Sequence, residues 1–121
     1  MSKLGRYGKH IKKHIHADGT KLDSKREYNR YCELLLLVKG GYITDLKVHP
    51  PFSIVIGGVP VKLYSDRYPS GRQLKYYADF SYTEKGEYKI EDSKMQSGHR
   101  TEVYKIKRAL MRAMGYKIIE V

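Results

Sequence analysis

The chain has 121 residues, of which 40% are hydrophobic, and its 24 Lys and Arg against 13 Asp and Glu give a net charge of +11. This length and composition allow one small domain, or one domain with a tail, and exclude wholesale disorder. The charge favours polyanionic partners, with nucleic acid first, and the longest apolar run, Leu34 to Val38, is far too short to cross a bilayer.

The N-terminal segment is strongly basic. Its first 16 residues contain five Lys or Arg, three His and no acid, and such blocks are typically extended and contact phosphate. We therefore expect residues 1–22 to form a basic arm in front of a domain at 23–121. Three of its lysines are candidate contacts to nucleic acid: Lys9, Lys12 and Lys13. The single cysteine, Cys32, excludes an internal disulfide and fits a reducing cytosol, and we expect no membrane partner.

The first predicted element is a helix over residues 24–39. Ser24 followed by Glu27 is a capping-box signature, because each side chain can accept a hydrogen bond from the other residue's backbone N–H. Apolar residues then recur at helical spacing up to Gly40, which can end the helix.

The middle of the chain is typical of β-structure. We expect strands at 42–48, 52–56 and 59–64, followed by a polar loop at 65–73. The clearest hairpin joins a strand at 74–83 to one at 88–93 through Lys85-Gly86.

The C-terminal part is expected to be a helix and a short strand. Thr101 can cap a helix that runs to Met114, and residues 116–121 are apolar enough for a strand. The inward face of this helix is predicted to be apolar, with Val103, Ile106, Leu110 and Met114. A basic stripe on the opposite face offers further candidate phosphate contacts: Lys105, Arg108 and Arg112. Helix, strands, helix and strand together predict a mixed α/β fold, with a mixed sheet flanked by helices.

Acidic residues are concentrated on the predicted hairpin. With the turn centred between Lys85 and Gly86, Asp79 falls directly opposite Asp92, and both side chains project from the face that also carries Lys94. Opposed carboxylates destabilise a sheet unless a cation lies between them, and Mg²⁺ prefers a few carboxylate oxygens together with water. A solvent-facing charged hairpin without a metal is the alternative.

The acid residues and the lysine form a recognisable pattern. Tyr77-Ala78-Asp79-Phe80 followed by Glu91-Asp92-Ser93-Lys94 resembles the motif of the PD-(D/E)XK nucleases. Together with the segments Leu22 to Glu27, Arg30-Tyr31 and Thr101 to Lys107, it resembles a family of small phage and prophage proteins linked to endonuclease I-type Holliday junction resolvases.

This resemblance implies a cytoplasmic, metal-dependent endonuclease that uses Mg²⁺ or Mn²⁺ and acts on branched DNA as a homodimer. Asp79, Asp92 and Glu27 would bind the metal, and Lys94 would position water or stabilise the transition state.

Several alternatives stay open from the residues alone. Glu27 can be only a helix cap, and Glu91 can replace Asp92 as the second ligand, although strand alternation favours Asp92. A non-catalytic nucleic-acid-binding protein, or a nuclease for linear or nicked DNA, would also account for the positive charge.

Overall fold

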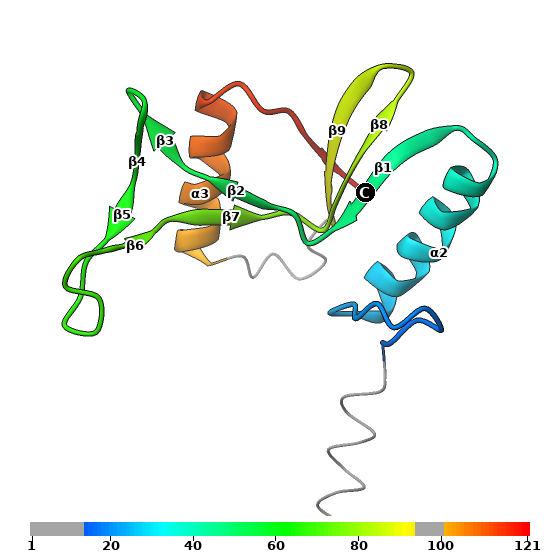
Figure 1. The fold of residues 1–121 in the computed structure, drawn as a ribbon, viewed down its shortest axis with the longest axis horizontal. Helices are drawn as coiled ribbons and strands as arrows, with labels where there is room; N and C mark the ends of the chain where they lie inside the picture. Colours follow the sequence, from blue (N-terminus) through cyan, green and yellow to red (C-terminus); the bar gives the residue numbers. More distant parts are fainter. Residues whose placement is uncertain (1–13, 94–100) are drawn as a thin grey trace, which may run out of the picture. The chain divides into compact units, whose positions relative to one another are not determined.

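The computed structural model describes residues 14–93 and 101–121. The chain has a mixed α/β fold and forms two compact units, residues 1–43 and 44–121 (Figure 1). In the described part, no helix has both the length and the apolar character required to cross a membrane.

The first unit is built on helix α2 (Lys25–Lys39), which confirms the predicted helix. The Ser24 hydroxyl accepts a hydrogen bond from Glu27 N at 3.1 Å, which satisfies one of the free N–H groups of the first turn. At the other end Gly40 N donates to Leu36 O at 2.9 Å.

Residues 14–22, the described part of the expected arm, fold onto this helix. Leu22 is buried and its N–H donates to His14 O at 2.9 Å. The Tyr31 hydroxyl donates to Asp18 Oδ2 at 2.7 Å, and Thr20 N donates to Asp18 Oδ1 at 2.9 Å. These bonds tie the segment to the helix, so residues 14–22 are not an extended arm.

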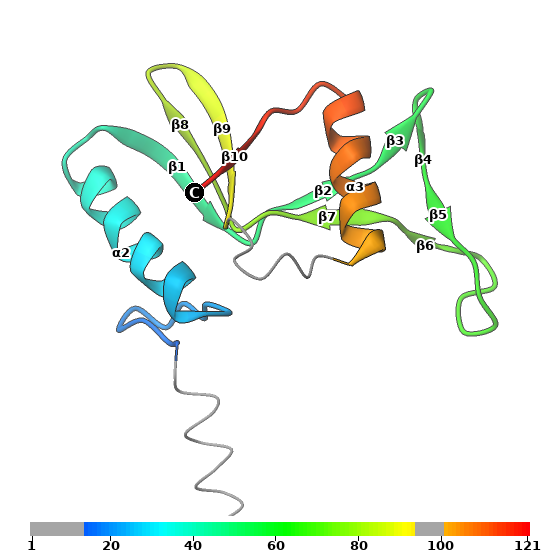
Figure 2. The same ribbon diagram turned by 180° about the vertical axis from the view of Figure 1, so that it is seen from behind.

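The second unit contains a four-stranded mixed sheet in the order β1-β8-β9-β10. Its strands are β1 (Ile43–Val48), β8 (Phe80–Glu84), β9 (Glu87–Asp92) and β10 (Ile118–Glu120). The β8–β9 pair is the predicted hairpin, with Phe80 opposite Glu91 and Glu84 opposite Glu87. Lys85 and Gly86 have φ values of 52° and 79°, as a tight hairpin turn requires. β10 runs parallel to β9 at the edge of the sheet (Figure 2).

Three short antiparallel pairs separate β1 from β8. They are β2 (Pro51–Ser53) with β7 (Lys75–Tyr77), β3 (Val55–Ile56) with β4 (Val59–Pro60), and β5 (Lys62–Leu63) with β6 (Arg72–Gln73).

Two expectations for this region were wrong in detail. The predicted loop at 65–73 ends in β6, and the predicted strand at 74–83 is two strands in different sheets. The backbone changes its hydrogen-bonding partner at this break. Ala78 N donates to Pro50 O at 3.3 Å, whereas the next residue, Asp79, donates from its N–H to Glu91 O at 3.1 Å.

Helix α3 (Glu102–Ala113) begins at the predicted cap, where Thr101 Oγ1 accepts a hydrogen bond from Tyr104 N at 3.1 Å. It packs on the core of the second unit, whose buried members are Phe52, Ile54, Tyr76, Ala78, Ile90, Met111 and Ile118.

The predicted inward face of this helix was partly wrong. Val103 and Ile106 are 59% and 56% exposed, whereas Met111 is fully buried and Tyr104, Leu110 and Met114 pack beside it. The apolar residues of the helix cover an arc that is wider than its buried face, so periodicity alone does not define which of them are buried. Met111 packs in the core, and the Tyr104 hydroxyl forms hydrogen bonds with Tyr76 and Asp92.

Candidate metal centre

The hairpin places Asp79 and Asp92 on neighbouring segments that are linked by hydrogen bonds to both side chains. Asp79 N donates to Asp92 Oδ1 at 2.9 Å, and Ser93 N donates to Asp79 Oδ2 at 2.6 Å. Each side chain therefore accepts a backbone hydrogen bond from the opposite segment, which fixes both carboxylates at the end of the β8–β9 ladder. We call these two residues the acidic pair.

Local structure explains why the acidic pair is held firmly. Asp79 lies at the break between β7 and β8, and Asp92 is the last residue of β9. The backbone of Asp92 is also bound on its other side, where its carbonyl accepts a hydrogen bond from Val121 N at 3.0 Å. Only 4% of Asp92 is exposed.

A tyrosine from α3 completes the support of Asp92. The Tyr104 hydroxyl donates to Asp92 Oδ2 at 2.6 Å and lies 3.2 Å from the Tyr76 hydroxyl. Tyr104 was missed in the sequence, because it is one of twelve tyrosines and the predicted helix face did not include it.

The two adjacent acids of β9, Glu91 and Asp92, have different hydrogen-bonding partners. Glu91 is buried, and its Oε2 accepts a hydrogen bond from the Tyr82 hydroxyl of β8. Adjacent side chains of a strand point to opposite faces of the sheet. Asp92 is therefore the acid that meets Asp79, as strand alternation predicted, and Glu91 is engaged on the other face.

The donor set of the acidic pair fits a hard divalent cation. Three of its four carboxylate oxygens accept the hydrogen bonds described above, and each oxygen has a second lone pair. Asp79 Oδ1 accepts no hydrogen bond from the described residues. Mg²⁺ and Mn²⁺ bind through one or two carboxylates and keep several waters, so this set is sufficient.

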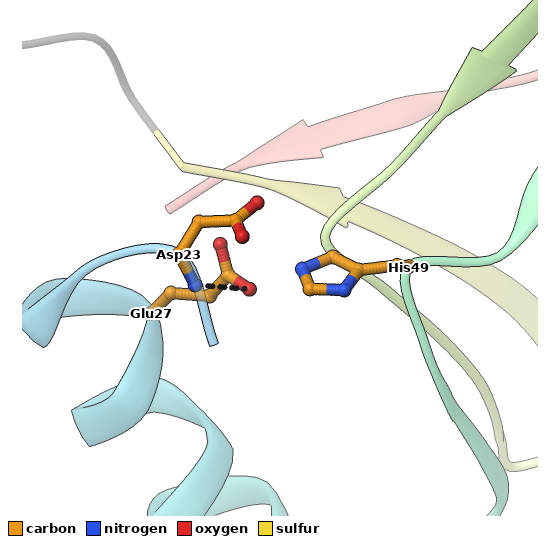
Figure 3. Close-up of side chains that lie close together, drawn as sticks. All are labelled: Asp23, Glu27 and His49. Atoms are coloured by element: carbon orange, nitrogen blue, oxygen red, sulfur yellow. Dashed lines mark hydrogen bonds between the residues drawn. The ribbon is translucent and has the colours of Figure 1, made fainter. Parts of the chain in front are cut away.

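Glu27 belongs to the first unit, where it lies in the first turn of α2. Its carboxylate accepts a hydrogen bond from Asp23 N, drawn as a dashed line in Figure 3, but at 3.5 Å this bond is at the outer limit of length. Only 3% of Glu27 is exposed. A buried carboxylate costs free energy unless polar or charged neighbours compensate it.

His49, also drawn in Figure 3, belongs to the second unit and was missed in the sequence. Its N–H donates to Asp79 O at 2.9 Å, so its backbone is fixed beside the acidic pair. With a φ of 52° it adopts the left-handed conformation that few non-glycine residues occupy. The only signal in the sequence was a histidine in front of two prolines.

The structure describes only some of the remaining predicted residues. Lys94 and the arm lysines (Lys9, Lys12 and Lys13) lie outside the described residues. The α3 stripe of Lys105, Arg108 and Arg112 lines one open pocket of about 280 Å³ together with Tyr104, Ala109 and Glu120.

Arg108 is more covered than the other two residues of the stripe, Lys105 and Arg112, which are exposed. Its side chain is only 15% exposed and forms an ion pair with Glu120 of β10. The hydrogen bond to Glu120 raises the pKa of Arg108 above its ordinary value, and the nearby negative charge of Asp92 adds to this. Arg108 therefore places a fixed positive charge near the acidic pair.

Comparison with protein families gives one match. The family described as "Protein of unknown function (DUF1064)" matches residues 7–120, which is nearly the whole chain. No curated protein and no solved structure matches the chain. The chain therefore belongs to the DUF1064 family of proteins of unknown function.

Proposed function

We propose that the protein is a metal-dependent DNA endonuclease that hydrolyses phosphodiester bonds. The observation that carries the proposal is the acidic pair, because two carboxylates fixed by backbone hydrogen bonds form a ready site for a divalent cation.

Each residue of the proposed site has its own role. Asp79 and Asp92 hold Mg²⁺ or Mn²⁺, with Glu27 as a third ligand. When bound, the metal would supply Lewis-acid activation of water and of the scissile phosphate. Lys94, two residues beyond Asp92, orients the attacking water and offsets the negative charge that develops on the phosphate. Tyr104 orients Asp92 through its hydroxyl.

The order of elements supports a core of the PD-(D/E)XK type. If the short strands β2 to β7 are set aside, a helix (α2) and the strands β1, β8 and β9 are followed by a helix (α3) and a final strand (β10). Asp92 ends β9, and Asp79 directly precedes β8. We propose that a homodimer acts on branched DNA, because two such sites can cut two strands that meet at a junction. This substrate rests on the resemblance of the sequence motifs.

The test is a cleavage gel with purified protein. A labelled four-way junction and a linear duplex with the same arm sequences are incubated with Mg²⁺, with Mn²⁺ and with EDTA. The proposal predicts metal-dependent cuts near the branch point and slower cutting of the linear duplex.

The same gel separates the two alternatives. Equal cutting of both substrates would support a nuclease but contradict a preference for junctions. Binding without cleavage in either metal would favour a non-catalytic DNA-binding protein, and it would contradict the catalytic role of the acidic pair.

A further inference from the structure

A second concave surface lies on the second unit, beside α3 and the short strands β5, β6 and β7. It is an open groove of about 560 Å³, and we call it the wing groove. Its lining residues are Leu63, Arg72, Gln73, Leu74, Lys75, Tyr77 and Lys107. None of them belongs to the acidic pair or to the stripe on α3.

The polar lining of the wing groove is cationic. Arg72, Lys75 and Lys107 come from three different elements and converge on it, and none of them forms an ion pair with a described carboxylate. The Arg72 guanidinium lies 5.1 Å from the ring centroid of Tyr68, a cation–π contact that orients it and leaves its N–H groups available. Three such cations in one groove favour an anionic ligand with several charges.

The wing groove also presents apolar surface to the ligand. Tyr77 is 58% exposed and Leu63 is 47% exposed. An exposed aromatic ring beside a row of cations is typical of sites for single strands, because unpaired bases can stack on the ring while phosphates meet the cations. In an intact duplex the bases are stacked on each other, so a tyrosine would have no free base to contact.

The path of the chain connects this surface to the acidic pair. Tyr77 is two residues before Asp79, and Lys75 is four residues before it. An extended chain spans at most about 14 Å over four residues, which is the axial length of roughly four nucleotides of one strand. A strand that enters the wing groove is thus within a few nucleotides of the candidate metal centre.

We propose that the wing groove binds a single strand of DNA, with its phosphates on Arg72, Lys75 and Lys107 and a base stacked on Tyr77. The choice of DNA among polyanions rests on the proposed nuclease function, but the binding itself requires no metal and no cleavage.

The test measures binding in EDTA, where cleavage does not contribute. Fluorescence anisotropy gives the affinity for a labelled single-stranded oligonucleotide and for a hairpin duplex, each over a series of salt concentrations. The groove variant is Lys75→Gln with Lys107→Gln, and Tyr77→Ala is compared with Tyr77→Phe. The matched control removes two exposed lysines outside the groove, as Lys85→Asn with Lys117→Gln; Asn suits the left-handed backbone at residue 85.

The groove variant should lower the salt slope of single-strand binding by about 1.4, at about 0.7 for each lost phosphate contact. Tyr77→Ala should weaken single-strand binding roughly 5- to 150-fold, with duplex binding unchanged. Tyr77→Phe should retain the affinity, since the ring is preserved.

Two results would overturn the proposal. One is a groove variant that loses no more single-strand affinity than the control pair does. The other is a Tyr77→Ala variant that binds the single strand as tightly as the wild type. Neither result bears on cleavage by the acidic pair, which the junction gel measures separately.

Discussion

Removal of the Tyr104 hydroxyl should destabilise the fold and also damage the proposed metal site. In Tyr104→Phe the ring stays in place, but Asp92 Oδ2 loses a hydrogen bond of 2.6 Å, and Asp92 is a buried residue with only 4% of its surface exposed. A hydrogen bond to a charged group contributes about 1.5–3 kcal/mol. At about 4 °C per kcal/mol, the Tm should fall by about 6–12 °C.

The effect on cleavage should be larger than the loss of stability explains. A residue that orients a metal ligand typically contributes about 10- to 100-fold to metal affinity or activity. We therefore expect Tyr104→Phe to require more Mg²⁺ for half-maximal cleavage, when assayed well below its Tm.

The chain offers a closely matched control on the other face of the same hairpin. Tyr82→Phe removes the hydroxyl that donates to Glu91, an equally buried carboxylate one residue away from Asp92. It should lower the Tm by a similar amount and leave the Mg²⁺ dependence of cleavage unchanged. An equal shift of the Mg²⁺ dependence in both variants, or a shift in Tyr82→Phe alone, would refute the assignment of Asp92 as the second ligand.

Three further predictions concern the N-terminal part of the chain. The Tyr31 hydroxyl and, after it, the backbone N–H of Thr20 hold the pKa of Asp18 well below its ordinary value of 3.8. Asp18 therefore stabilises the fold above that pH, so the Tm difference between wild type and Asp18→Asn should shrink as the pH falls below 3.8; a difference that grows in acid would contradict this. Glu27→Gln should keep the Tm and lose cleavage, whereas Ser24→Ala should lose about 1 kcal/mol of stability and keep cleavage; full cleavage by Glu27→Gln would leave Glu27 as a cap only. Deletion of residues 1–13 should lower the salt slope of duplex binding by about 0.9 for each lost phosphate contact, with cleavage of bound DNA unchanged; an unchanged slope would remove the arm from the binding surface.

Local signals predicted the parts of the fold that depend on neighbouring residues. The capping residues Ser24 and Thr101 mark the starts of α2 and α3, because a cap acts within one turn. The Lys85-Gly86 turn determines the hairpin register. Once that register was known, the approach of Asp79 to Asp92 followed from the geometry of an antiparallel pair.

Features that depend on distant partners could not be predicted in this way. The break at Asp79 arises because β7 pairs with β2, about 25 residues earlier in the chain, and no local residue pattern encodes that choice. The inward turn of Tyr104 depends on Asp92 and Tyr76, and the pairing of Arg108 depends on Glu120 of the last strand. Polar partners that are distant in the sequence therefore decide which side chains of the helix are buried, whereas helical periodicity indicates only the mean direction of its apolar face.

A measurement of Mn²⁺ affinity shows whether the acidic pair binds a divalent cation. Electron paramagnetic resonance of free Mn²⁺ would give the affinity of the wild type, of Asp79→Asn and of Glu87→Gln, which changes an exposed acid of the same hairpin. Glu87→Gln should bind Mn²⁺ as tightly as the wild type does. Asp79→Asn should lose more than about 100-fold in Mn²⁺ affinity, which exceeds the effect of a residue that only orients a ligand. Asp79→Asn protein that is folded and binds Mn²⁺ as tightly as the wild type would contradict metal binding by the acidic pair.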